Sequence, residues 1–156
     1  IFTNFLIFIL ITACGYKPIY KKNKIATIEV GKIEFLGERK INNRILDFVK
    51  VEKNSSNNIS QTLILNSTKE NIITSKDKTG NPSTYQMTIK TNIILKNNET
   101  ESINKNLIAN FSYSNKENKF ELNEYKKTIE ENLIKSISEK IVIFLSLEKW
   151  FLSPTI

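Results

Sequence analysis

The chain has 156 residues, of which 40% are hydrophobic and 25% charged, and its net charge is +7. This length and composition are typical of one globular domain with its own core rather than of a disordered chain. A single cysteine excludes an internal disulfide, and the lack of histidine excludes ordinary zinc sites and histidine-based catalytic triads, so we do not expect an enzyme.

The N-terminal segment 1–13 carries no charge and contains the most hydrophobic run of the chain, FLIFILIT, at residues 5–12. This run is too short for a membrane-spanning helix, which needs about 20 residues, but it has the length of a signal-peptide core. Residues 1–13 are therefore predicted to be a signal peptide. Because the chain starts at Ile1 rather than Met, we expect a few upstream residues, with the usual positive charge, to be missing.

The only cysteine follows this run, and ITAC at residues 11–14 resembles the bacterial lipobox. The resemblance implies cleavage before Cys14 and covalent N-acyl and S-diacylglycerol groups on it, with no other cofactor. Three buried acyl chains anchor a protein firmly. Gly15 stands where inner-membrane retention signals have Asp, which implies the outer membrane. The alternative is that Cys14 is buried near an N-terminal core strand. Residues 14–24 are predicted to be a tether that Pro18 keeps extended.

The domain is expected to begin with a strand and a helix. In IATIEVGKIEFLG the apolar residues alternate but change phase at Gly31, as in a strand with a β-bulge. ERKINNRILDFVKVEKN then predicts a helix, because one stripe recurs at helical spacing. That stripe consists of Ile41, Ile45, Phe48, Val49 and Glu52.

Three strands are expected next. Residues 60–78 predict one long strand, or two short ones broken near Asn66–Lys69, and TGNPS is a turn. Segments 82–96 and 104–114 predict a β-hairpin. Its inner face is expected to consist of Tyr85, Met87, Ile89, Ile93, Leu107, Ala109 and Phe111. The opposite face is polar, so water or another protein should lie against it.

The last element is predicted to be an amphipathic helix, with Asn118 and Glu121 as its capping box. Its apolar stripe consists of Leu122, Tyr125, Ile129, Leu133, Ile137, Ile141 and Phe144. Residues 148–156 are expected to be a loosely ordered tail. The order β-α-β-β-β-α predicts an α+β two-layer sandwich over residues 25–147, in which two helices cover a four-stranded mixed or antiparallel sheet.

Four segments, in this order, resemble LptE, the lipoprotein family of the lipopolysaccharide-assembly translocon of double-membraned bacteria. They are CGYKPIY, DKTGNPSTYQMTIKTNIIL, LIANFSYS and EENLIKSISEKIVIFL. The resemblance implies a protein lipid-anchored on the periplasmic side of the outer membrane. Such a protein plugs the β-barrel LptD, helps it assemble and assists insertion of lipopolysaccharide into the outer leaflet.

The family's lipid-contacting basic residues lie in the turn between the second and third strands, where this chain has Lys76 and Lys78. The resemblance therefore implies that these two lysines contact lipopolysaccharide. The family more often has Arg there, and Lys cannot hold a phosphate through two parallel hydrogen bonds. The plainer interpretation of both lysines is a solvated turn.

Two other classes of protein remain as alternatives. A lipid-binding lipoprotein of another envelope lipid-transport system would need an apolar groove, and the chain has no surplus of apolar residues beyond a two-layer core. A nucleic-acid binder would use the positive charge and the aromatic residues. An exported, acylated protein does not meet nucleic acid, so we expect no such partner.

Overall fold

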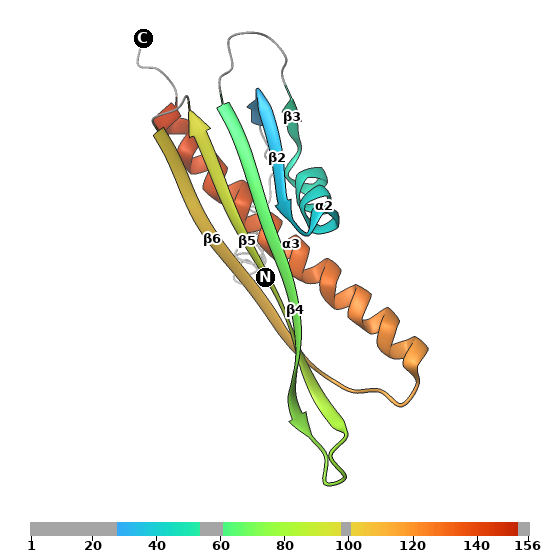
Figure 1. Ribbon diagram of the computed structural model, residues 1–156. Coiled ribbons are helices and arrows are strands. Elements are labelled where there is room, and N and C mark those ends of the chain that lie inside the picture. Colours follow the sequence, from blue (N-terminus) through green and yellow to red (C-terminus); the bar gives the residue numbers. More distant parts are fainter. Residues whose placement is uncertain (1–27, 54–60, 98–100, 153–156) are drawn as a thin grey trace, which may run out of the picture.

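The computed structural model describes residues 28–53, 61–97 and 101–152. These residues form a four-stranded sheet with two helices (Figure 1), which confirms the predicted α+β class. The elements are β1 (Ile28–Val30), β2 (Lys32–Gly37), α2 (Arg39–Val49), β3 (Val51–Lys53), β4 (Gln61–Lys76), β5 (Pro82–Asn97), β6 (Glu101–Ser114) and α3 (Lys119–Leu152). Cys14, the predicted signal peptide and the predicted tether lie outside the described residues.

The large sheet has the strand order β2-β4-β5-β6 and is mixed. Strands β4, β5 and β6 form an antiparallel meander, in which Leu63 pairs with Leu95 and Ile89 with Ala109. Strand β2 runs parallel to β4, with α2 and β3 in the connection between them. Of the two alternatives for residues 60–78, the single long strand is the correct one.

The phase change at Gly31 marks a change of sheet and not a β-bulge. Strand β1 pairs in parallel with β3 to form a second, two-stranded sheet, whereas β2 joins the large sheet. The Gly31 N–H donates to the carbonyl of Gln61 at 2.9 Å, which is the first bond into the large sheet. An alternation that breaks phase is compatible with either arrangement, and only the position of the partner strand decides between them.

Helix α2 is shorter than its predicted stripe. Ile41, Ile45 and Val49 are buried as expected, but Phe48 is 37% exposed and Glu52 lies in β3. The helix ends because Lys50 adopts a left-handed conformation with φ 56°, and its N–H donates to the Leu46 carbonyl at 3.0 Å. The residues that follow are then free to pair with β1.

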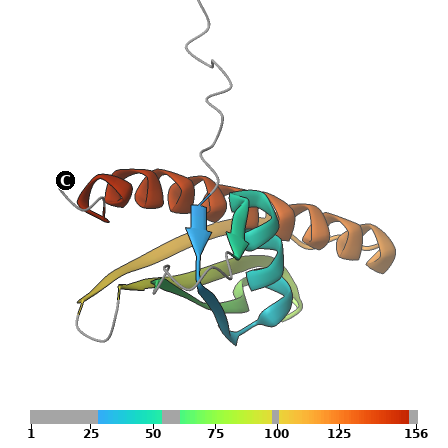
Figure 2. The same ribbon diagram turned by 90° about the horizontal axis from the view of Figure 1, so that it is seen from above.

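Both helices cover the same face of the large sheet (Figure 2): α3 contacts β5 and β6, α2 contacts β2 and β4, and the helices contact each other. Their apolar side chains, such as Ile137 of α3, share one core with odd-numbered positions of the meander, such as Leu65 and Ile89. One charged side chain from this face is neutralised where the helices meet. Lys69 of β4 lies 2.8 Å from the carboxylate of Glu130, which is also 3.7 Å from Arg44 of α2.

Phe111 is a correction to the predicted inner face of the hairpin. Tyr113, Ala109 and Leu107 are buried on that face, yet Phe111 between them is 46% exposed. It lies on β6, the edge strand, where a large ring has a neighbouring strand on one side only. Strict alternation predicts the face that a side chain belongs to but not how far the helices cover that face.

Helix α3 begins at the Asn118 side-chain cap, which is one half of the predicted capping box; the Glu121 carboxylate instead lies 3.7 Å from Lys116 Nζ. The Asn118 Oδ1 accepts from the backbone N–H groups of Phe120 at 2.9 Å and Glu121 at 3.4 Å. The helix runs to Leu152, so residues 148–152 are helical where a loose tail was expected. Within the described ranges, neither helix has an apolar run long enough to cross a membrane.

Candidate functional site

The β4–β5 hairpin projects beyond the rest of the sheet. Strand β2 pairs with β4 only over residues 32–37 and 62–67, and β4 continues to Lys76 with β5 alongside it. In Figure 1 this end of the hairpin is the lowest part of the molecule, past the end of β6. Two hydroxyl pairs, Thr74 with Thr84 and Ser75 with Ser83, both at 2.8 Å, bridge the two strands near the tip.

The turn at the tip is organised by one carboxylate. The Asp77 Oδ1 accepts from the N–H of Thr79 at 2.9 Å, the hydroxyl of Thr79 at 2.7 Å and the N–H of Asn81 at 2.9 Å. The Thr79 hydroxyl and the Asn81 N–H lower the pKa of Asp77 below its ordinary value. Gly80 has φ 87°, a backbone conformation that residues other than glycine rarely adopt.

Lys76 and Lys78 flank Asp77 and are both exposed. Among the described residues neither ammonium group makes an ion pair, and the Asp77 Oδ1 between them accepts three hydrogen bonds within the turn. The two lysines therefore present their charges to solvent at the end of the hairpin. Exposed lysines at this place are expected both for a contact with lipopolysaccharide and for a solvated turn.

A cluster of aromatic rings and lysines lies where this hairpin meets the start of α3. The rings of Tyr85 and Tyr113 stack at 5.5 Å, and Tyr125 meets Tyr113 edge-on at 5.9 Å. Lys126 Nζ lies 5.4 Å from the Tyr85 ring centre, and Lys116 Nζ lies 5.1 Å from that of Tyr125, both within cation–π range. We call these five residues the aromatic–lysine cluster.

The cluster is held in place by its buried member. The Tyr113 hydroxyl donates to the Asn71 Oδ1 at 2.9 Å, and burial raises the pKa of Tyr113. Large apolar side chains remain exposed around it, namely Ile73 on β4, Phe111 on β6 and Phe120 on α3. Ile73 pairs with Tyr85 and is three residues from Lys76, a distance of about 10 Å along a strand.

The sequence did not predict the aromatic–lysine cluster. The sequence placed Tyr85 on the inner face of the hairpin, and no motif singled out Lys116 or Lys126. The alternation of β5 and β6 does predict that Tyr85 and Tyr113 share a face. How α3 crosses that face depends on packing, and no local pattern places the two lysines over the rings.

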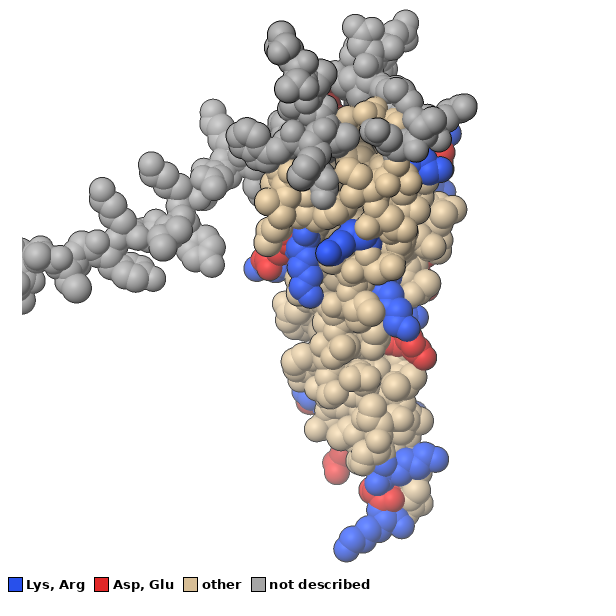
Figure 3. Space-filling model, turned by 90° about the vertical axis from the view of Figure 1, so that its left-hand side faces the viewer, with Lys and Arg blue, Asp and Glu red and all other residues tan. Residues whose placement is uncertain are grey.

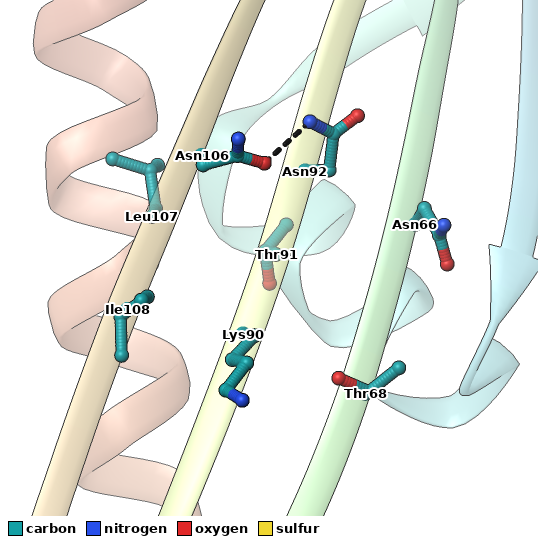
Figure 4. Close-up of a pocket in the computed structure, with 8 residues that line it drawn as sticks. All are labelled: Asn66, Thr68, Lys90, Thr91, Asn92, Asn106, Leu107 and Ile108. Carbon is teal, nitrogen blue, oxygen red and sulfur yellow. Dashed lines mark hydrogen bonds between the residues drawn. The ribbon is translucent and has the colours of Figure 1, made fainter.

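The other face of the large sheet has no helix against it among the described elements. It carries a hollow of about 310 Å³, lined by Asn66, Thr68, Lys90, Thr91, Asn92, Asn106, Leu107 and Ile108 (Figure 4). The Asn92 amide donates to the Oδ1 atoms of both Asn104 and Asn106 at 2.6 Å. The lining of this hollow therefore offers amides, hydroxyls and the Lys90 ammonium group to a polar neighbour, which agrees with the polar face that the sequence predicted.

No family model and no curated protein matches this sequence. Solved structures do match the fold. The crystal structure of the rare lipoprotein B from Shewanella oneidensis superposes with a TM-score of 0.61 at 12% identity, over 78% of this chain and 98% of that one. A minor lipoprotein from Acinetobacter baumannii superposes with a TM-score of 0.59 at 11% identity, over 78% of this chain and 95% of that one. This chain shares its fold with both lipoproteins.

Proposed function

We propose that this chain is an outer-membrane lipoprotein, acylated at Cys14, that plugs the β-barrel LptD, helps it assemble and contacts lipopolysaccharide during insertion. One observation carries the proposal. The hairpin end combines exposed lysines, the aromatic–lysine cluster and exposed apolar side chains on a fold shared with solved lipoproteins. The resemblance of the sequence to LptE supports the choice of barrel and ligand.

The chemistry of the hairpin end suits an anionic amphiphile. Lys76 and Lys78 act as point charges toward lipid A phosphates. Ile73, Phe111 and Phe120 are all exposed and leave apolar surface for acyl chains. A brief contact with a lipid in transit needs such a surface rather than a deep pocket.

The open face of the sheet suits a barrel lumen. The interior of a large outer-membrane barrel is polar, so a plug must present hydrogen-bonding side chains to it. Asn66, Asn92 and Asn106 do so across three adjacent strands. The lipid anchor at Cys14 would hold the plug at the membrane that contains the barrel.

The test is affinity purification of the full chain from detergent-solubilised outer membrane, followed by mass spectrometry. We expect a large β-barrel to co-purify in a stoichiometric amount, and the mature chain to start at Cys14 with added lipid mass. A chain that retains FLIFILIT without lipid would refute the anchor. Purification without any barrel would refute the role as a plug.

A further inference from the structure

We propose that the outer edge of β6 accepts an extended loop of the barrel partner as an added strand. The inference rests on the proposed function, which supplies the barrel. Strand β6 is the last strand of the sheet, so one row of its backbone N–H and C=O groups has no partner strand among the described residues. Such a row is a template for strand addition.

Two hydrogen bonds show which residues of β6 form this row. The N–H of Asn115 donates to the Ser83 carbonyl at 2.8 Å, so odd-numbered residues bond to β5. Lys140 Nζ donates to the Ile108 carbonyl at 3.3 Å from outside the sheet. The even-numbered residues Ile108, Asn110 and Ser112 therefore direct their backbone groups outward, toward the place of an added strand.

The sequence of β6 itself lacks the usual protection against strand pairing. Segment 106–114, NLIANFSYS, contains no charged residue and no proline, although natural edge strands commonly carry lysine or proline. Figure 3 looks onto the β6 side of the molecule and shows an uncharged stretch above the charged tip of the hairpin. Lys140 donates to the Ile108 carbonyl alone, so the outward groups of Asn110 and Ser112 have no strand beside them among the described residues, and an edge of this length is expected to be covered in the assembled state.

The exposed side chains of β6 favour a polypeptide as the occupant. Ile108 is 53% exposed on the open face, and Phe111 is exposed on the helix-bearing face. A single added strand would place side chains beside both, which a lipid on one face would not do. A second copy of this chain is disfavoured, because two copies each carry a net charge of +7.

The added segment must come from a part of the barrel protein outside its wall. Every wall strand in a closed barrel already has two neighbours, so it has no free edge to offer. A loop that enters the lumen has unpaired backbone groups. An uncharged loop in extended conformation would match the uncharged edge of β6.

The test compares Asn110→Pro with Asn110→Ala in the full chain. Proline removes an outward N–H without removing a bond to β5, whereas alanine keeps that N–H and serves as the matched control. We expect about tenfold less barrel to co-purify with the proline variant than with the alanine variant. Proline removes one hydrogen bond to the added strand, and its ring disturbs the packing of that strand against β6. Hydrogen exchange in the wild-type complex provides a second measurement that does not depend on the folding of a variant.

In that measurement we expect the amides of Ile108, Asn110 and Ser112 to exchange about a hundredfold more slowly in the complex than in the free chain. The amides of Leu107 and Ala109, which bond to β5, should be protected in both states. Equal exchange of the outward amides in both states, with the barrel still bound, would overturn this inference and leave the proposed function intact. Slow exchange with no barrel bound, and with a dimer of this chain instead, would overturn both.

Discussion

The two faces of strand β5 have neighbours of opposite kinds, although their residues alternate in a single sequence. Ile89 is fully buried beneath α3, and its chain neighbour Lys90 is exposed at the hollow on the open face. The covered face is filled by the side chains of both helices, and the open face by amides and hydroxyls. The buried core therefore lies on one face, and the other face presents hydrogen-bonding side chains to a neighbour.

The largest effect is expected from Ile89→Asp. The substitution buries a carboxylate with no partner and also leaves a cavity, so we expect the free energy of unfolding to fall by about 4 kcal/mol or more. Urea unfolding, followed by circular dichroism, measures the change. A loss below about 1 kcal/mol would mean that Ile89 does not lie in the core.

The next effect concerns binding at the hairpin tip. Changing Lys76 and Lys78 together to Glu reverses two exposed charges, each worth on the order of 1 kcal/mol, and should weaken lipopolysaccharide binding by roughly tenfold or more. Titration at low and high salt measures it, and the difference from wild type should shrink at high salt.

The matched control for the hairpin tip changes both lysines to Ala, and its effect should be smaller because no repulsion is introduced. Folding should be retained in both variants, since Asp77, Thr79 and Gly80 form the turn. If the double Glu variant binds as tightly as wild type, the two lysines are only a solvated turn, and any contact with lipid lies elsewhere.

A smaller effect is expected at the start of the helix that covers β5. Asn118→Ala removes the side-chain acceptor for two backbone N–H groups of α3 and should cost about 1 kcal/mol. Asn118→Asp should keep most of the stability, because a carboxylate also accepts these bonds. Thermal unfolding of both variants provides the comparison, and equal losses would argue against capping.

The smallest effect on stability is expected from Lys90→Asp, the chain neighbour of Ile89. The side chain is exposed on the open face, so unfolding should change by less than about 0.5 kcal/mol. Binding to a partner on that face is the property that should change. Losses of similar size from Ile89→Asp and Lys90→Asp would show that the two faces are not distinct.

The sequence predicted those elements whose pattern is long and local. Two-residue alternation placed the β5–β6 hairpin, and a three- to four-residue stripe placed α3. It did not predict β3, the change of sheet at Gly31 or the exposure of Phe111. Each of these features depends on which distant segment of the chain packs beside the residue in question. A pattern of neighbouring residues does not contain that information. The candidate site likewise has a part that is visible in the sequence and a part that only the packed structure shows.

At the hairpin end, the sequence placed Lys76 and Lys78 in a turn, and the resemblance to LptE made them candidates for contact with lipopolysaccharide, which stays a prediction. Lys116 and Lys126 were not, because the crossing of α3 over β5 places them beside Tyr125 and Tyr85. A turn is formed by consecutive residues, so its chemistry is visible in the sequence. A cluster formed by two strands and a helix requires the packed structure.

The mixed sheet also has a consequence for the order of folding. Strands β4, β5 and β6 follow one another in the chain and can pair through short connections. Strands β2 and β4 are separated in the chain by α2 and β3. Closing that longer loop costs more entropy before any contact compensates for it. We therefore expect the meander to form the nucleus and β2 to dock late. Comparing φ-values for Ile89→Val and Ile33→Val tests this order, and a higher value at Ile33 would reverse it.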